Sequence, residues 1–223
     1  MAERGRKPSA PKQDRAIRTR EMILQAAGGL FDERGYAGTT VADITERAGV
    51  TKGALYHHFS DKKALGTAVI KAQMEGMTSV PSHRLKLQEL VDTGYFLAYQ
   101  LRTDPIQRGA STLAMEQGPV DFDRMSSMDL WIDFVTSILT AAQEHGELLD
   151  YVDIPRVAWL FVGGFAGIQN MSNAYNKRQD LTSRLSDFWE YLLPSIARPV
   201  ILAKVNIDPE RGERMAEGIA VAA

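Results

Sequence analysis

The stretch at 51–57 reads T-K-G-A-L-Y-H and offers side chains that could contact a nucleic-acid duplex. A lysine can donate to guanine, and threonine, tyrosine and histidine can reach phosphates or bases. Two small residues would let a helix come close to base edges and to a thymine methyl group. The candidate DNA contacts in this stretch are Thr51, Lys52, Gly53, Ala54, Tyr56 and His57.

Residues suited to other chemistry are few. The chain has no cysteine, which excludes a disulfide framework, a thiolate nucleophile and a thiolate-ligated metal. No two of the histidines fall in a metal-ligand spacing such as H-E-x-x-H, and no glycine-rich phosphate loop or nucleophile elbow occurs. We therefore expect no enzymatic activity, no bound metal and no cofactor. The four histidines are His57, His58, His83 and His145.

The net charge of −2 hides an uneven distribution along the chain. The first 63 residues carry twelve Lys and Arg against eight Asp and Glu, whereas the remaining 160 carry fourteen against twenty. A positive end on a negative body indicates that a polyanion would meet one end only, although a basic tail can also be merely solvated. Further candidate DNA contacts are Arg4, Arg6, Lys7, Arg18, Thr40, Lys62 and Lys63.

Short helices must position these side chains, and the periodicity predicts them. A first helix runs from about Arg15 to Arg34, where Gly35 closes it. Thr40 to Phe59 then holds a helix of about two turns, a turn containing glycine, and a second short helix. This is the helix-turn-helix spacing, in which the first helix braces the second in a DNA major groove. The same spacing also occurs in helical bundles that do not bind DNA.

The remainder of the chain also shows helical spacing, so we expect an all-α protein. A fourth helix starts at Ser60-Asp61, and longer helices follow at 84–103, 106–117, 127–145, 154–176 and 181–197. From Lys204 onward we expect a short helix and a frayed tail. No apolar run approaches the roughly 18 residues of a membrane span, and the N-terminus lacks the apolar stretch of a signal peptide. We therefore expect a cytoplasmic protein without a membrane partner, associated with the nucleoid when it binds DNA.

Several segments resemble the TetR family of repressors. The match is closest at Thr39–Ile44, Ala48–Phe59 and Lys62–Leu65, within the DNA-binding domain. Other segments resemble the γ-butyrolactone receptor branch of this family, found in antibiotic-producing actinomycetes, and the resemblance spans roughly residues 12–212. The branch segments are Lys12–Arg20, Arg84–Leu90, Leu101–Pro105, Gly146–Leu149 and Val162–Gln169.

The resemblance implies a homodimer that pairs through the helices near 154–176 and 181–197. Such a dimer reads a pseudo-palindromic operator and is released by a diffusible γ-butyrolactone, butenolide or furan signal, which implies control of antibiotic production. The implied domains are a flexible basic arm at 1–14, a helix-turn-helix domain at 15–63, a ligand-binding and dimerisation domain at 64–203 and a tail at 204–223.

The resemblance also implies which residues hold the signal. Gln73 and Trp131 match positions that the branch uses in its ligand cavity, and an indole N–H and an amide suit a lactone carbonyl or hydroxyl. Because Gln73 lies on the helix that carries Lys62 and Lys63, it could move the DNA-binding domain as a lever. The implied ligand contacts are Gln73, Met115, Trp131, Gly164, Phe165 and Ile168.

Two positions depart from the branch pattern. Gly164 stands where close members have a threonine, and His57 stands where phenylalanine is usual. The missing threonine hydroxyl favours a related or bulkier signal, or close helix packing at this glycine. One alternative is a sensor of drugs or antibiotic intermediates. Another is an architectural DNA-binding protein, which the acidic C-terminal half argues against.

Overall fold

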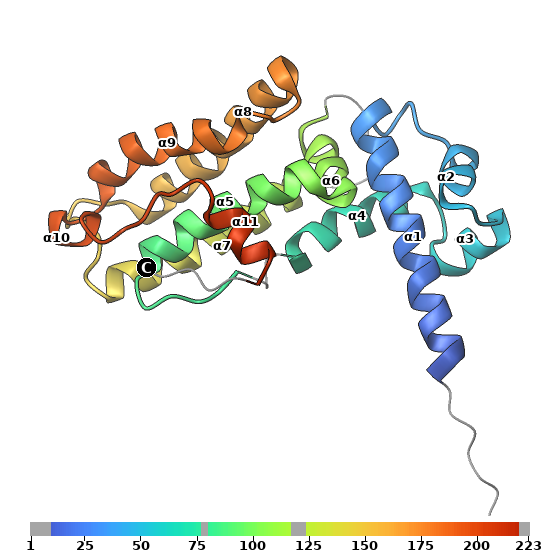
Figure 1. The fold of residues 1–223 in the computed structure, drawn as a ribbon, viewed down its shortest axis with the longest axis horizontal. Helices are drawn as coiled ribbons and strands as arrows, with labels where there is room; N and C mark the ends of the chain where they lie inside the picture. Colours follow the sequence, from blue (N-terminus) through green and yellow to red (C-terminus); the bar gives the residue numbers. More distant parts are fainter. Residues whose placement is uncertain (1–9, 77–79, 117–123, 219–223) are drawn as a thin grey trace, which may run out of the picture.

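The computed structural model describes residues 10–76, 80–116 and 124–218. In these ranges the chain forms helices and connecting turns, with one isolated bridge between Leu148 and Ala197 and no strand, so the expected all-α class is confirmed. Figure 1 shows an N-terminal end made by the first helices, and a long helical body on the other side. Along the chain the helices are α1 (Ala10–Arg34), α2 (Val41–Ala48), α3 (Lys52–His58), α4 (Lys62–Gly76), α5 (Lys86–Thr103), α6 (Pro105–Met115), α7 (Arg124–Glu144), α8 (Ile154–Asn176), α9 (Leu181–Ile196), α10 (Pro199–Leu202) and α11 (Arg211–Ala216).

The first helix is longer than the sequence indicates. It begins at Ala10 rather than near Arg15, so residues 10–14 of the expected flexible arm are helical. Pro11 lies in the first turn, where its missing N–H would have no partner inside the helix and its fixed φ suits helical backbone. The proline therefore marks the beginning of α1 and not a segment ahead of it.

Local hydrogen bonds fix both ends of α2 and the start of α3. The Asp43 backbone N–H donates to Thr40 Oγ1 at 3.2 Å, and the Thr40 N–H donates to Asp43 Oδ2 at 2.9 Å. This reciprocal pair is a capping box, worth about 1 kcal/mol in typical helices. Gly49 ends α2 in the left-handed conformation at φ 65°, and Thr51 Oγ1 accepts from Ala54 N–H to cap α3.

One apolar core holds α1 to α4 together, and α6 belongs to it. Ile44, Leu55 and Phe59 of the helix-turn-helix are buried in the same cluster as Ile106 and Leu113 of α6. The helices α1 and α6 touch at backbone level, because a Cβ atom on Gly109 would lie 2.3 Å from the Gly28 carbonyl oxygen. The packing of this N-terminal end thus reaches well past residue 63.

A second core fills the body formed by α5, α7, α8 and α9. Its centre is Trp189, which is fully buried and stacks on Phe161 with 5.1 Å between ring centroids. The helices α8 and α9 lie side by side along one edge of the body and are joined by a tight turn (Figure 1). In that turn Lys177 and Arg178 both have positive φ values, of 59° and 65°.

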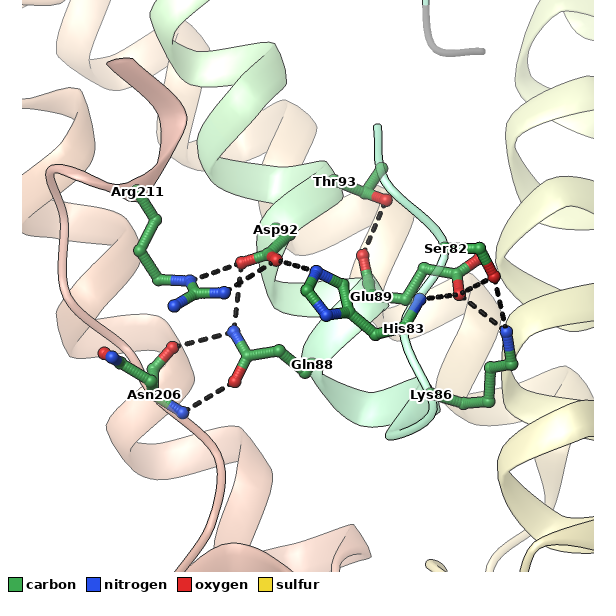
Figure 2. Close-up of polar contacts among 9 residues, drawn as sticks. All are labelled: Ser82, His83, Lys86, Gln88, Glu89, Asp92, Thr93, Asn206 and Arg211. Carbon is green, nitrogen blue, oxygen red and sulfur yellow. Dashed lines mark hydrogen bonds and ion pairs between the residues drawn. The ribbon is translucent and has the colours of Figure 1, made fainter. Parts of the chain in front are cut away.

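The segment from Lys204 is bound along α5, and within the described residues it is no frayed tail (Figure 2). Arg211 is fully buried and donates to the equally buried Asp92, with Nε–Oδ1 at 2.6 Å and Nη2–Oδ2 at 2.9 Å. The same carboxylate accepts from Gln88 Nε2 at 3.0 Å and lies 2.7 Å from His83 Nε2. The Gln88 amide also exchanges two hydrogen bonds with the backbone of Asn206. The expected short helix exists as α11. The ion pair between Arg211 and Asp92 holds it in place, and the apolar content of the sequence does not reveal this pair.

Candidate nucleic-acid interface and ligand cavity

The outer face of α3 is free for a ligand. Leu55 and the following Phe59 point into the core, which turns Lys52, Gly53 and Tyr56 outward. Tyr56 is 51% exposed although it is a large aromatic residue, and His57 beside it is also exposed. A Cβ atom on Gly53 would meet only Thr51 Oγ1, at 3.9 Å, so the backbone of α3 is open to close approach here.

Two predicted DNA contacts have structural partners inside the protein. Lys62 is half-buried, donates from Nζ to the Thr39 carbonyl oxygen at 2.7 Å and lies 4.1 Å from the centroid of the Tyr36 ring. It therefore joins α4 to the turn before α2, and its contact with DNA phosphate stays a prediction. The Thr40 side chain is exposed but is engaged in the capping box with Asp43.

The remaining predicted DNA contacts separate into three groups. Arg18 and Lys63 are exposed, as is Thr51, whose oxygen caps α3. Ala54 is half-buried. Arg4, Arg6 and Lys7 lie outside the described residues.

A cation at the junction of α1 and α3 escaped the sequence analysis. The Arg20 guanidinium lies 5.5 Å from the centroid of the Phe59 ring. Desolvation lowers the pKa of the half-buried His58 below its usual value, and the charges of His57 and Arg20 lower it further. Besides the histidines, the exposed basic side chains on this side are Lys52, Lys63 and arginines of α1.

A cavity of about 50 Å³ lies where α4, α5, α6, α7 and α8 meet. Four of the predicted ligand contacts line it, namely Gln73, Met115, Trp131 and Phe165. Trp131 Nε1–H donates to Gln73 Oε1 at 3.3 Å, and Gln73 Nε2 donates to the Gln107 carbonyl oxygen of α6 at 3.3 Å. One amide thus joins α4, α6 and α7 at the cavity.

The other two predicted ligand contacts, Gly164 and Ile168, are not among the residues that line this cavity. A Cβ atom on Gly164 would lie 2.8 Å from Cε2 of Phe188 on α9, so this glycine allows close packing of α8 against α9. Ile168 lies one turn on, in a groove between the same two helices. At about 100° per residue, Gly164 and Ile168 lie about 100° and 60° around α8 from Phe165, toward α9.

The correct cavity face of α8 follows from the spacing around Phe165. Val162, Phe165, Ala166 and Gln169 are i, i+3, i+4 and i+7 and all line the cavity. This spacing is the signal that could have identified them from the sequence. The lining residues that the sequence analysis did not name are Thr93, Gly94, Leu97, Leu101, Ser111, Ala114, Met128, Phe161, Val162, Ala166 and Gln169.

The groove between α8 and α9 opens on the outside of the body and is mostly apolar. Leu160 and Met171 of α8 are exposed there, as is Tyr191 of α9 at 81%. Exposed aromatic and aliphatic side chains gathered on one face are typical of a protein interface. These are the two helices to which the family resemblance assigns dimerisation.

The ranges that the structure describes hold neither the residue cluster of a metal site nor a helix suited to a membrane. In them no three His, Asp or Glu residues gather as a metal site would require. None of the described helices combines the length and the apolar character that crossing a membrane demands.

Known proteins match this chain along most of its length. The model for bacterial regulatory proteins of the tetR family matches residues 23–69. The A-factor receptor protein of Streptomyces griseus is 36% identical over 203 residues, which cover 89% of this chain and 70% of that protein. The crystal structure of TylP, a TetR regulator from Streptomyces fradiae, is 40% identical, with a TM-score of 0.86 over 92% of this chain and 98% of that chain.

A γ-butyrolactone receptor, an ArpA-like protein, also has this fold. Its crystal structure is 26% identical and gives a TM-score of 0.69 over 92% of this chain and 100% of that chain. The matched residues 23–69 contain the helix-turn-helix whose outer face is free in this structure. The chain therefore belongs to the tetR family of bacterial regulatory proteins, and it is a transcriptional repressor of that type and no enzyme.

Proposed function

We propose that this repressor binds a pseudo-palindromic operator as a homodimer and is released by an uncharged molecule of the γ-butyrolactone type. In this proposal the protein works in the cytoplasm, and its release from DNA controls genes of antibiotic production. One observation carries the proposal: the cavity shares two of its walls, α4 and α6, with the N-terminal end that holds the helix-turn-helix. The helix α4 supplies Gln73 to the cavity and Val69 to the core under α3, and α6 supplies Met115 and Leu113 in the same way.

The volume of the cavity supports a mechanism of release. At about 50 Å³ it is far smaller than the roughly 300–1,000 Å³ of pockets that hold drug-sized ligands. A ligand of that size would have to push the surrounding helices apart. Because α4 and α6 are packed against α1, this expansion would change the distance between the two α3 helices of a dimer. The ligand would therefore prefer the conformer that fits DNA less well.

The end of α6 provides a direct contact through which movement can pass. The Tyr36 backbone N–H, in the turn between α1 and α2, donates to Glu116 Oε2 at 2.8 Å. Glu116 follows the cavity residue Met115 and is the C-cap residue of α6. A shift of α6 would therefore displace the turn that precedes the helix-turn-helix.

The side chains of the cavity support a neutral, largely apolar ligand. No charged residue is among those that line it in the described part of the chain. The hydrogen-bonding groups are the Trp131 indole, the Gln73 and Gln169 amides and the hydroxyls of Thr93 and Ser111. A lactone with an alkyl chain fits this pattern, because its ring oxygens are acceptors and its chain matches the apolar walls.

The groove between α8 and α9 supports the homodimer. In a two-fold symmetric dimer the same patch of each subunit covers the other, so the exposed Leu160, Met171 and Tyr191 would be buried against their equivalents. Two α3 helices held in this way would read half-sites about one helical turn, roughly 34 Å, apart.

The test selects bound sites from random duplex DNA and then footprints the purified protein on the recovered sequence. We expect a bounded, pseudo-palindromic site, occupied by two chains and released by a synthetic γ-butyrolactone carrying a branched acyl chain. Diffuse protection without a selected sequence would contradict sequence-specific repression. A selected site that this lactone never releases would contradict the ligand class only.

A sensor of larger hydrophobic compounds is a second candidate. The observation that favours it is the set of large apolar residues in the wall, Met115, Met128, Phe161 and Phe165, since flexible methionines adapt to different shapes. The same release assay with neutral aromatic antibiotics separates the two candidates. Release by these compounds and not by the lactone would favour the second.

A further inference from the structure

A buried arginine outside α4 connects the cavity wall to the first helix. Arg178 lies in the turn between α8 and α9 and is only 3% exposed. Its Nε donates to Gln169 Oε1 at 3.2 Å, and its Nη1 lies 3.5 Å from Asp32 Oδ1. One guanidinium therefore contacts a cavity residue of α8 and an acid in α1.

The two contacts cannot move independently. A guanidinium is planar and rigid, so a shift of the Nε end moves the Nη end with it. The turn adds a further constraint, because Arg178 has a φ of 65° and its backbone N–H donates to the Ser172 carbonyl oxygen at 3.2 Å. The left-handed backbone and this hydrogen bond point the side chain inward between α8 and α1.

Burial makes the pairing costly to lose. Desolvation lowers the pKa of Arg178 from its ordinary value, while the charge of Asp32 and its hydrogen bond oppose that effect. The carboxylate therefore compensates a charge that solvent does not reach. If Gln169 turned away, one buried donor of Arg178 would have to find another acceptor, and the guanidinium would shift relative to Asp32.

Asp32 also binds α6 and lies near the end of α1. It lies in the last turn of α1, two residues before Arg34 ends that helix. Arg108 Nε donates to its Oδ2 at 3.1 Å and Thr112 Oγ1 to its Oδ1 at 3.3 Å, both from α6. The carboxylate thus joins α1, α6 and the α8–α9 turn close to the chain that leads into α2.

We propose that Arg178 is a coupling residue, which transmits the position of Gln169 in the cavity wall to α1 through Asp32. The proposal rests on the ligand-released repression described above, and it adds a second connection beside α4. A ligand that displaces or hydrogen-bonds Gln169 would shift Arg178, and with it the end of α1 that precedes the helix-turn-helix. Arg178 does not line the cavity and so does not contact the ligand. Its proposed role is to position Asp32.

A double-mutant cycle tests the connection without any ligand. Gln169→Met removes the acceptor of Arg178 and keeps the length of the side chain, and Asp32→Asn removes the carboxylate charge. Operator dissociation constants are measured for the wild type, both single variants and the double variant. We expect the two effects to be non-additive by at least about threefold, equal to about 0.7 kcal/mol.

The chain offers a matched control next to Asp32. Glu33 is on the same helix turn, and its carboxylate pairs with Arg47 of α2 at 2.7 Å instead of with Arg178. Glu33→Asn is therefore expected to combine with Gln169→Met additively, within about 1.5-fold, since sites without shared partners do so. In an Arg178→Lys background, which keeps the positive charge but lacks the rigid fork, the effect of Gln169→Met on operator binding should disappear.

Hydrogen exchange gives a readout that needs no DNA. We expect Gln169→Met to speed amide exchange in residues 29–36 at least threefold in the wild-type background, and not in the Arg178→Lys background. Thermal unfolding curves show whether each variant is folded. Additive effects in both measurements would overturn the coupling role. If no operator is selected, the proposed function fails, whereas the exchange comparison still decides the role of Arg178.

Discussion

At the scale of single residues, the DNA-facing side divides into side chains with internal partners and side chains that are free. Thr40 and Lys62 have hydrogen-bond partners inside the protein, whereas Lys52, Tyr56 and His57 do not face the core. Both groups have polar or basic residues that sequence reasoning treats alike. The difference depends on the fold, because the acceptor of Lys62 is a carbonyl oxygen 23 residues earlier.

Lys52→Ala should weaken operator binding and relax the preference at one base pair. A lysine that donates to guanine contributes about 1–3 kcal/mol to discrimination at its position. The measurement is a set of operator affinities for every substitution in the half-site. Lys62→Ala is the matched control, and it should reduce thermal stability without changing base preference. Equal loss by Lys52→Ala on every sequence would make Lys52 a phosphate contact.

Tyr95 should make stability depend on alkaline pH. Burial raises its pKa to about 12, above the value of about 10 in an unfolded chain, although its hydrogen bond to Ser186 acts in the other direction. The folded state therefore favours the neutral phenol, and this contribution is complete below pH 10 and is lost as the pH rises through 12. Urea unfolding between these pH values should show a steeper fall for the wild type than for Tyr95→Phe, by up to about 2.7 kcal/mol.

Ser186→Ala serves as the control for this experiment. It removes a hydrogen-bond partner of the phenol but leaves the phenol itself buried, with its hydroxyl donating to the Ile207 carbonyl oxygen at 2.7 Å. The steep alkaline fall should remain in that variant. The same slope in the wild type and in Tyr95→Phe would show that ionisation of Tyr95 does not contribute.

At the scale of helices, the contact between α1 and α6 makes α6 part of the core that holds the DNA-binding end together. The glycines allow it: a Cβ atom on Gly28 would lie 2.6 Å from the Pro105 carbonyl oxygen, and Gly109 is equally close to Gly28. Two helices that meet at backbone level form a stiff joint, since no side chain separates them. Movement of α6 at the cavity is then passed to α1 with little loss.

Comparing Gly28→Ala with Gly29→Ala tests the backbone contact between α1 and α6, because only Gly28 touches the backbone of α6. Overpacking against backbone should make Gly28→Ala destabilising by about 1–3 kcal/mol. At Gly29 the added Cβ would meet the end of the Arg47 side chain at 3.3 Å, which can move. Gly29→Ala should therefore be neutral or stabilising, by up to about 1 kcal/mol of helix propensity. Urea unfolding measures both, and similar values would refute the backbone contact.

The helices themselves could be predicted from the sequence, since apolar spacing and capping residues are local. The ranges at 154–176 and 181–197 match α8 and α9 to within one residue. The predicted start of α1 near Arg15 is wrong, because the helix begins at Ala10. A proline in a basic segment is typical of a tail, but proline is also favourable in a first helical turn. The membership of α6 in the first core could not be predicted, since it depends on which distant glycines meet.

At the scale of the whole molecule, the cavity, the DNA-binding end and the α8–α9 face are connected through shared helices. The cavity residues come from five helices, so their grouping depends on tertiary packing. Family resemblance pointed to four of them, whereas Gly164 and Ile168, which it also named, lie on the side of α8 that faces α9. Arg178, Asp32 and Gln169 could not be connected from sequence, because Asp32 lies more than a hundred residues before the other two.

Tyr191→Glu should separate the proposed dimer and abolish operator binding together. A charge at the centre of an apolar interface would be buried without a partner, which costs several kcal/mol. Analytical ultracentrifugation gives the mass, and binding to a single half-site gives the remaining affinity. Leu130→Glu, which alters an exposed leucine of α7 outside the groove, should leave the dimer intact. A Tyr191→Glu protein that remains dimeric would move the interface elsewhere.

The charge pair between Asp92 and Arg211 has a consequence for how this protein is made. The two residues are 119 positions apart, and the acid lies at the centre of the body. A nascent chain on the ribosome reaches its final packing around α5 only after codon 211 has been translated. A frameshift or nonsense mutation between codons 92 and 211 would therefore leave the Asp92 carboxylate without its arginine partner, although residues 23–69 would be complete. Such a product would have a DNA-reading domain but no stable sensor.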